Sequence, residues 1–239
     1  MTSSAGDRGD RIRAMILQHE DPTPPGYVTE WLEQHGADHE VFRIDLEDRE
    51  LDPTQYNLIV SLGSEFAAFD ESHAFVPREY RLMERAVDAG MPILGLCFGG
   101  QMLARVLGGE VYRGSEAEIG WLPVRTKDPE LVPEGPWFQW HFDIIEPPRD
   151  VDVVADTDLG AQAFVAGRSL GLQFHPEVTP EIMGDWVRAY PHELEAEGVD
   201  PAKLLEETNR RARESKRTSW KLLERFWDRV ARLDRRVTT

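Results

Sequence analysis

The chain has 239 residues, of which 41% are hydrophobic, so it can bury one sizeable core, and its formal net charge is −17. Because a phosphate backbone attracts Lys and Arg, this charge argues against a nucleic-acid-binding protein. No apolar run approaches the ~20 residues that cross a bilayer, and the N-terminus lacks the apolar segment of a signal peptide, so we expect a cytoplasmic protein with no membrane contact.

The first half of the sequence alternates strand and helix patterns. Three short apolar runs rich in branched residues predict buried strands, and segments with helical spacing lie between them. This alternation predicts a mostly parallel sheet with helices on both faces. Ligands bind at the carboxyl ends of the strands in such sheets, which is where Gly63 and Cys97 lie. The expected strands are residues 11–17, 56–63 and 92–97, and the expected helices are residues 27–36 and 80–90.

The second half changes character. Residues 109–177 form a series of short strand patterns with no helix among them, which indicates antiparallel or mixed strands that complete one sheet. A helix is expected after Thr179 and Pro180, because threonine can cap it and proline fits its first turn. The predicted organisation is a flexible N-terminus at residues 1–10, one domain at residues 11–200 and a helical extension at residues 201–239.

The extension is basic and amphipathic. From Ala202 onward it holds 12 Lys and Arg against 6 Asp and Glu, a net of +6, so the preceding residues carry −23. An apolar stripe has helical spacing, while the arginines at 225, 229, 232 and 236 lie largely off it. The simpler interpretation is that the stripe docks on the chain's own body; the alternative is a docking helix for a second subunit. The stripe consists of Leu223, Phe226, Trp227 and Val230.

Cys97 is the only cysteine, which excludes an intrachain disulfide. It lies in the pattern Gly-x-Cys-x-Gly between a predicted strand and a predicted helix. Small residues on either side of a nucleophile allow the sharp strained turn that exposes its side chain. The N-terminus of the following helix favours a thiolate at this position. We therefore interpret Cys97 as a nucleophile, although a lone cysteine at a strand end can also be structural.

A cysteine nucleophile needs a base, and the base needs a group that orients it. His175 ends an apolar run and Glu177 follows two residues later, after a proline. The imidazole can accept and return a proton while the carboxylate holds its tautomer. The alternative is a His and a Glu in an ordinary surface loop. His19, Glu20, His35 and His39 lack the spacing of metal ligands, and no P-loop is present, so we expect no metal and no cofactor.

The stretch "GLCFGGQ", followed 78 residues later by "HPE", resembles the class I glutamine amidotransferase family. The similarity is greatest to stand-alone proteins that resemble the amidotransferase part of GMP synthase. It extends from about residue 11 to about residue 190 and includes "EIGW" at 118–121, "QWHFD" at 139–143 and "QAF" at 162–164. The resemblance implies a flavodoxin-like α/β fold and attack by Cys97 on the side-chain amide of glutamine.

The resemblance also implies roles for further residues. The backbone N–H groups of Gly63 and Phe98 would form the oxyanion hole, although family members commonly have Gly-Gly-Pro where this chain has "LGS" at 62–64. Gln101 and the backbone around His141 to Asp143, with Phe142 between them, would face glutamine. His141 is more simply a wall of the pocket than a second base.

Three functions remain open from the sequence. The first is a glutamine amidotransferase or glutaminase that delivers ammonia to a partner synthetase. The second is a hydrolase of another γ-glutamyl bond, in a peptide or conjugate. The third is a non-catalytic regulator, which the complete set of Cys97, His175 and Glu177 makes the weakest of the three. A homo-oligomer is compatible with each of them.

Overall fold

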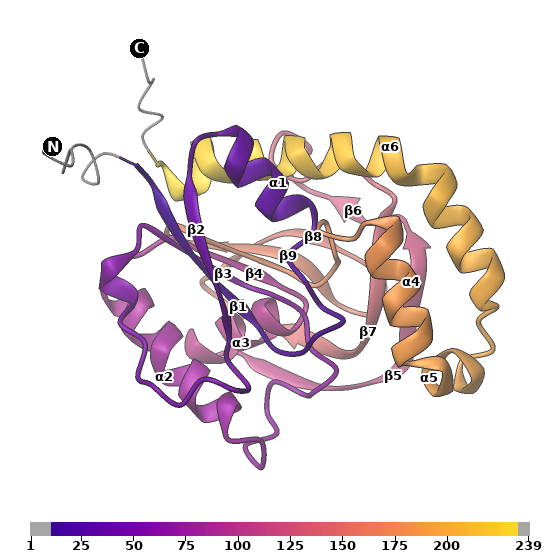
Figure 1. The fold of residues 1–239 in the computed structure, drawn as a ribbon, viewed down its shortest axis with the longest axis horizontal. Helices are drawn as coiled ribbons and strands as arrows, with labels where there is room; N and C mark the ends of the chain where they lie inside the picture. Colours follow the sequence, from indigo (N-terminus) through magenta and orange to yellow (C-terminus); the bar gives the residue numbers. More distant parts are fainter. Residues whose placement is uncertain (1–10, 234–239) are drawn as a thin grey trace, which may run out of the picture.

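The computed structural model describes residues 11–233, which are built around one ten-stranded sheet (Figure 1). Five strands pair in parallel in the order β2-β1-β3-β4-β10. The residues on one strand alternate between the two faces, so Ala14 and Ile16 join one core cluster while Met15 and Leu17 join another. The parallel strands are β1 (Arg13–Gln18), β2 (Asp38–Arg43), β3 (Leu58–Ser61), β4 (Ile93–Leu96) and β10 (Ser169–Leu172).

The remaining strands extend the sheet with antiparallel pairs. After β10 the order continues β9-β7-β5, and two further strands pair beside β9. This confirms the mixed sheet predicted for residues 109–177. The antiparallel strands are β5 (Glu110–Leu122), β6 (Arg125–Thr126), β7 (Trp137–Glu146), β8 (Asp152–Asp156) and β9 (Ala161–Ala166).

Helices cover both faces of the sheet (Figure 1). On one face α2 and α3 pack against the strands, and on the other α1 and the C-terminal segment do so. A third apolar cluster joins α4 and α5 to β7. The helices are α1 (Tyr27–Gln34), η1 (Pro53–Gln55), α2 (Phe75–Asp88), α3 (Phe98–Val106), α4 (Pro180–Ala189), α5 (Pro191–Ala196) and α6 (Pro201–Arg225), which continues as the π-helix η2 (Phe226–Ala231).

Local chemistry explains the boundaries of these elements. As predicted, the Thr179 hydroxyl caps α4 by accepting the Ile182 N–H at 3.2 Å. The helix expected at 80–90 instead begins at Phe75, because Pro77 fits within a first turn, where no N–H is needed. The edge strand β2 was missed, since its residues are mostly polar or exposed and form no apolar run.

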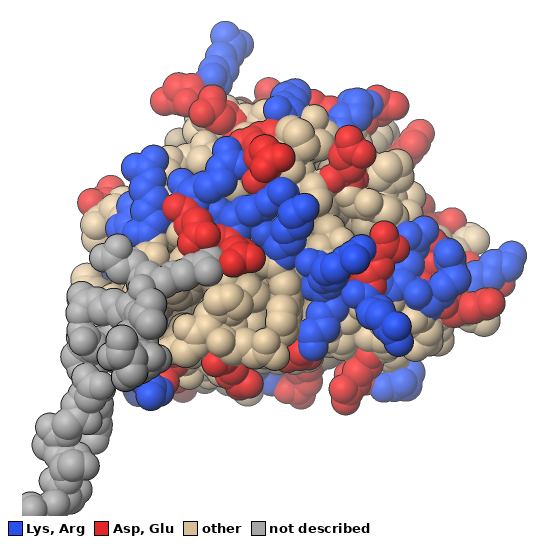
Figure 2. Space-filling view, turned by 90° about the horizontal axis from the view of Figure 1, so that it is seen from above, with Lys and Arg blue, Asp and Glu red and all other residues tan. Residues whose placement is uncertain are grey.

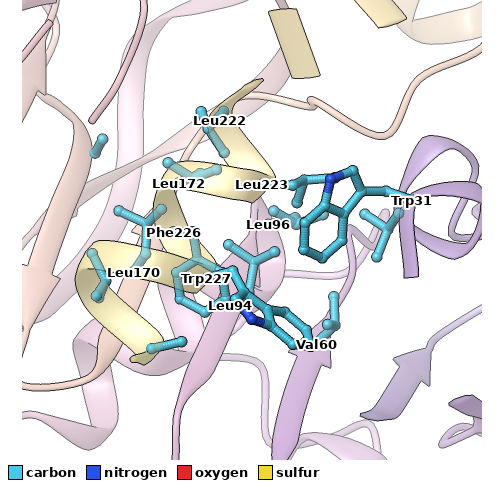
Figure 3. Close-up of a cluster of buried hydrophobic side chains, with 14 of the residues drawn as sticks. Trp31, Val60, Leu94, Leu96, Leu170, Leu172, Leu222, Leu223, Phe226 and Trp227 are labelled. Carbon is cyan, nitrogen blue, oxygen red and sulfur yellow. The ribbon is translucent and has the colours of Figure 1, made fainter. Parts of the chain in front are cut away.

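The apolar stripe of the C-terminal segment packs on the chain's own body (Figure 3). Its four residues are between 2% and 4% exposed, and the Trp227 ring lies 5.3 Å from that of Trp31, between centroids. Arg229 pairs with Asp128 at 2.8 Å, and the backbone oxygen of Ala231 accepts hydrogen bonds from the Arg168 guanidinium. The segment therefore acts as part of the core, whereas Arg236 lies outside the described residues.

Charge is unevenly placed on the surface. Lys and Arg side chains gather on the face that carries α6, with acidic side chains among them (Figure 2). Two of these basic side chains form salt bridges with the body of the chain: Lys216 pairs with Glu30, and Arg225 pairs with Glu130. The N-terminal residues 1–10, predicted to be flexible, lie outside the described part of the chain. Within residues 11–233, no helix has both the length and the apolar character of a membrane span.

We predict that Trp227→Ala lowers the free energy of unfolding by about 3 to 5 kcal/mol, because it removes a large buried ring and leaves a cavity between α1 and the sheet. Denaturant unfolding followed by circular dichroism would measure the change. The control is Lys221→Ala on the exposed side of α6, which should change stability by less than about 0.5 kcal/mol. Equal stabilities for the two variants would contradict the packing role of the stripe.

Candidate active site

Cys97 occupies the turn between β4 and α3 with φ of 49° and ψ of −104°, a conformation that non-glycine residues rarely adopt. The flanking glycines allow this turn to pack closely. A Cβ on Gly95 would lie 2.4 Å from the Gly99 oxygen, and a Cβ on Gly99 would lie 2.2 Å from the Ser61 oxygen. The elbow predicted from sequence is therefore present. Its cysteine is only 5% exposed, because the side chain lines a hollow instead of the outer surface.

His175 and Glu177 follow β10, the strand beside β4. His175 Nδ1 lies 2.7 Å from Glu177 Oε1, and the two side chains are 4% and 3% exposed. Burial lowers the pKa of His175, but the charges of Glu177 and Cys97 outweigh this effect and raise that pKa to about 10. The imidazole is therefore protonated at neutral pH. Because both side chains are buried, the alternative of a His and a Glu in an ordinary surface loop is excluded.

The other nitrogen of His175, Nε2, is buried and faces Cys97, and a hydrogen bond to the Cys97 side chain is one cause that raises the pKa of His175. A Cβ placed on Gly63 would lie 2.8 Å from His175 Cε1 and 3.7 Å from Cys97 Cβ, so the end of β3 meets both side chains. The Cys97 sulfur also receives a 3.7 Å contact from Gln173 Nε2. A reacting group at the sulfur can thus reach both the imidazole and the β3 backbone.

The backbone N–H groups proposed for an oxyanion hole lie on two sides of Cys97. Phe98 begins α3, and Gly63 follows β3. The Gly63 oxygen lies 3.0 Å from His19 Nδ1, and the opposite nitrogen of His19 lies 2.7 Å from Glu79 Oε2. His19 and Glu79 are fully buried, and Ser61 Oγ donates to the other Glu79 oxygen at 2.5 Å. This network fixes the direction of the Gly63 carbonyl, which belongs to the peptide between Gly63 and Ser64.

Glu20 holds the loop that follows. Its carboxylate accepts hydrogen bonds from the Ser64 hydroxyl at 3.1 Å and from the Glu65 N–H at 2.9 Å. Burial is the main cause that raises the pKa of Glu20, against the lowering effect of the charge on His19. The adjacent pair His19 and Glu20, which the sequence offered only as poor metal ligands, therefore anchors this loop from both sides.

The predicted substrate residues line a second hollow that meets the first at Cys97. Gln101, His141, Phe142 and Asp143 all border it, together with Arg113, which the sequence reasoning missed. The Arg113 guanidinium lies 4.2 Å from the centroid of the Phe142 ring, and its Nη1 lies 3.7 Å from Asp143 Oδ1. Burial raises the pKa of Asp143. The hollow thus offers a cation and an acid side by side.

Three sequence motifs meet behind this hollow, on β5, β7 and β9. The Gln162 amide donates to Glu118 Oε2 at 2.7 Å and its oxygen accepts from Gln139 Nε2 at 2.9 Å. His141 Nε2 lies 3.1 Å from the same Glu118 oxygen. These contacts fix His141 against the sheet, as expected of a pocket wall. The structure therefore gathers the other eight predicted site residues around Cys97, and the catalytic roles of all nine stay predictions.

The described residues contain no group of three or more His, Cys, Asp or Glu side chains arranged to hold a metal ion. His35 and His39 lie on α1's end and on β2, away from Cys97. His35 Nδ1 contacts the Trp31 oxygen at 2.8 Å. The groups around Cys97 include an imidazole, carboxylates and backbone N–H groups.

A family model described as "Glutamine amidotransferase class-I" matches residues 27–187. The chain belongs to this family. A solved glutamine amidotransferase from Thermotoga maritima has a TM-score of 0.82 and 34% sequence identity, with 90% of this chain and 98% of that chain covered. Membership in this family confirms the predicted flavodoxin-like fold. It also identifies the protein as an enzyme.

Curated relatives of this enzyme include proteins named GMP synthase [glutamine-hydrolyzing]. The Thermus thermophilus protein is 36% identical over 152 residues, which cover 59% of this chain and 30% of that protein. The Staphylococcus saprophyticus protein is 33% identical over 149 residues, which cover 59% of this chain and 27% of that protein. The chain thus spans less than a third of the length of these relatives.

We predict that iodoacetamide alkylates Cys97 rapidly at pH 7, because a protonated His175 stabilises the reactive thiolate. In His175→Ala the rate at pH 7 should fall at least tenfold and then rise steeply toward pH 9, as for an ordinary thiol. Mass spectrometry of the single cysteine gives the rate directly. The His39→Ala control should alkylate like the wild type, and a wild-type rate that also rises steeply with pH would contradict the thiolate–imidazolium pair.

Proposed function

We propose that this enzyme hydrolyses the side-chain amide of glutamine through a γ-glutamyl thioester on Cys97 and releases ammonia for an acceptor on a partner enzyme. The observation that carries this proposal is a buried His175 whose Nδ1 lies 2.7 Å from Glu177 and whose ring lies beside a cysteine in a strained elbow. The family and its glutamine-hydrolysing relatives support the same conclusion.

The first half of the reaction begins from a Cys97 thiolate paired with a His175 imidazolium. The Cys97 thiolate attacks the γ-carbonyl carbon. The resulting oxyanion accepts hydrogen bonds from the backbone N–H groups of Gly63 and Phe98. The tetrahedral intermediate collapses by breaking its carbon–nitrogen bond, while His175 gives its Nε2 proton to the departing nitrogen. Ammonia leaves, and Cys97 carries the γ-glutamyl group as a thioester.

The second half returns the enzyme to its starting state. Neutral His175 takes a proton from water, whose oxygen attacks the thioester carbon. The carbon–sulfur bond then breaks, which yields glutamate and restores the thiolate and the imidazolium. Glu177 accepts the hydrogen bond from Nδ1 in both halves and so holds the His175 ring.

The hollow bordered by Gln101 and Asp143 suits the amino-acid end of glutamine. We propose that Arg113 faces the α-carboxylate and Asp143 the α-ammonium group, since each charge then meets its opposite. Gln101 and His141 would complete this subsite with Phe142. A partner synthetase would take up the ammonia, because free ammonia is mostly protonated at neutral pH and then reacts poorly.

We predict that Cys97→Ala reduces turnover of glutamine below a few percent of the wild type while the fold stays intact, because only one sulfur atom is lost. His175→Ala should be nearly as severe, and the double variant scarcely worse than either, since the pair acts as a unit. A coupled assay for glutamate and ammonia measures turnover, and circular dichroism checks the fold. Turnover that survives in Cys97→Ala would refute the mechanism.

We also predict that His19→Ala lowers kcat for glutamine at least tenfold with KM changed less than about twofold, because the Gly63 carbonyl loses its anchor and the backbone that carries the adjoining Gly63 N–H, the oxyanion donor, is no longer held in place. His19→Gln keeps a side-chain donor for the Gly63 oxygen and should recover part of kcat. His39→Ala, a histidine on β2, is the matched control. A loss in His19→Ala that appears in KM alone would show that His19 acts on binding instead.

A further inference from the structure

The two hollows that meet at Cys97 have different chemistry. They share Ser64, Glu65, Cys97, Trp140 and Glu193, but only one of them contains His175 and only the other contains Gln101 and Arg113. We call the hollow with His175 the leaving-group pocket. It is bordered by Glu65, Trp140, His175, Trp186, Tyr190 and Glu193, with Cys97 at its floor.

Proton transfer decides which part of an amide occupies this pocket. The leaving nitrogen must receive its proton from His175, so it lies on the His175 side of Cys97. The glutamyl arm then extends to the opposite side, toward Gln101. His175 Nε2 is buried and faces Cys97, as expected for a donor that serves a group held at that sulfur. Any group attached to the leaving nitrogen therefore enters the leaving-group pocket.

The walls of this pocket are acidic and aromatic. Glu65 is exposed and Glu193 half-buried at its edge, and none of the residues that border it is Lys or Arg. The Trp140 Nε1–H donates to Glu193 Oε2 at 2.6 Å, which fixes the carboxylate beside the rings. Burial raises the pKa of Tyr190, and the charges of Glu20, Glu65 and Glu193 raise it further. The negative charges thus converge on one wall.

Three rings form that wall. The centroid of the Trp140 ring lies 5.8 Å from that of the Trp186 ring and 6.1 Å from that of the Tyr190 ring, and both pairs are packed edge to face. Aromatic faces next to carboxylates are a typical site for organic cations. The cavity volume is about 40 Å³, against the roughly 10 to 15 Å³ that one water molecule needs on the same measure, and the pocket opens to solvent. A leaving group larger than ammonia can therefore extend outward past the rings.

We propose that the leaving-group pocket binds a cationic amine, so that the preferred substrate is a γ-glutamyl amide of a diamine or polyamine whose far end is protonated. This proposal rests on the proposed cysteine hydrolysis and names its substrate class. Cys97 forms the same thioester, the carbon–nitrogen bond breaks, and the amine leaves with the His175 proton. Water then releases glutamate, so the products are glutamate and the free di- or polyamine.

The test compares four substrates with the full chain. The first is glutamine, whose leaving group is ammonia. The other three are the mono-γ-glutamyl amide of 1,4-diaminobutane, which ends in a cation, γ-glutamyl butylamide, which ends in a neutral methyl group, and the γ-glutamyl amide of 4-aminobutanoate, which ends in a carboxylate. Release of glutamate gives kcat/KM for each. We expect the diamine amide to exceed the butylamide at least tenfold and the carboxylate amide by more, because chain length is nearly constant while charge changes.

A variant then assigns the preference to the pocket. In the double variant Glu65→Gln/Glu193→Gln the ratio of diamine amide to butylamide should fall toward one, with the butylamide as the internal reference. Glu195→Gln, an exposed glutamate on α5 outside the pocket, is the matched control and should keep the wild-type ratio. Circular dichroism shows whether each variant is folded, and the wild-type comparison stands without any variant.

The outcomes separate the two proposals. Equal rates for the cationic and neutral amides, preference for the carboxylate, or cleavage of glutamine alone would each overturn the cationic pocket, while Cys97-dependent release of glutamate would still support the hydrolase. Cleavage of none of the four substrates would overturn both. A wild-type preference that the double variant retains would place the recognition elsewhere and overturn this pocket.

Discussion

The buried contact between His175 and Glu177 is the interaction on which the rest of the site depends. Without a carboxylate at Nδ1, the largest of the effects that raise the pKa of His175 would be lost, and burial would favour its neutral form. The fold holds Glu177 by its backbone as well, because its oxygen accepts the Tyr27 N–H at 3.0 Å, at the start of α1. Placing a Cβ on Gly26 would bring it within 2.0 Å of that oxygen. The orientation of one carboxylate is thus coupled to the packing of a helix far away in sequence.

Parallel strand order explains why residues from distant parts of the sequence meet at one point. β1, β3, β4 and β10 are neighbours in the sheet, and their carboxyl ends deliver His19, Gly63, Cys97 and His175, respectively, to the same edge. The antiparallel part of the sheet adds a wall to this site, because the backbone N–H of His175 donates to the backbone oxygen of Phe138 on β7 at 2.8 Å. The Cys97 pocket therefore lies where the two halves of the sheet join.

Sequence patterns predicted those features that depend on local backbone chemistry. Gly-x-Cys-x-Gly indicated the elbow because its close backbone contacts tolerate no side chain, and the apolar runs indicated the central strands because both sheet faces are buried. His19 and Arg113 carried no such signal. The role of His19 depends on Glu79, 60 residues away, and that of Arg113 on Asp143, which only the folded sheet brings together. Interactions at long sequence separation leave no periodic pattern.

The C-terminal extension connects stability to the leaving-group pocket. Trp186, Tyr190 and Glu193 lie on α4 and α5, short helices that share an apolar cluster with Leu204 of α6. The Trp121 indole donates to Thr208 Oγ1 at 2.9 Å, and the Tyr27 hydroxyl donates to the Ala212 oxygen at 3.3 Å. These contacts tie the first half of α6 to β5 and α1, while the second half is buried on the sheet. The helix that the sequence suggested as an appendage therefore supports the wall of the pocket, and its packing sets how firmly the three aromatic rings are held beside Cys97.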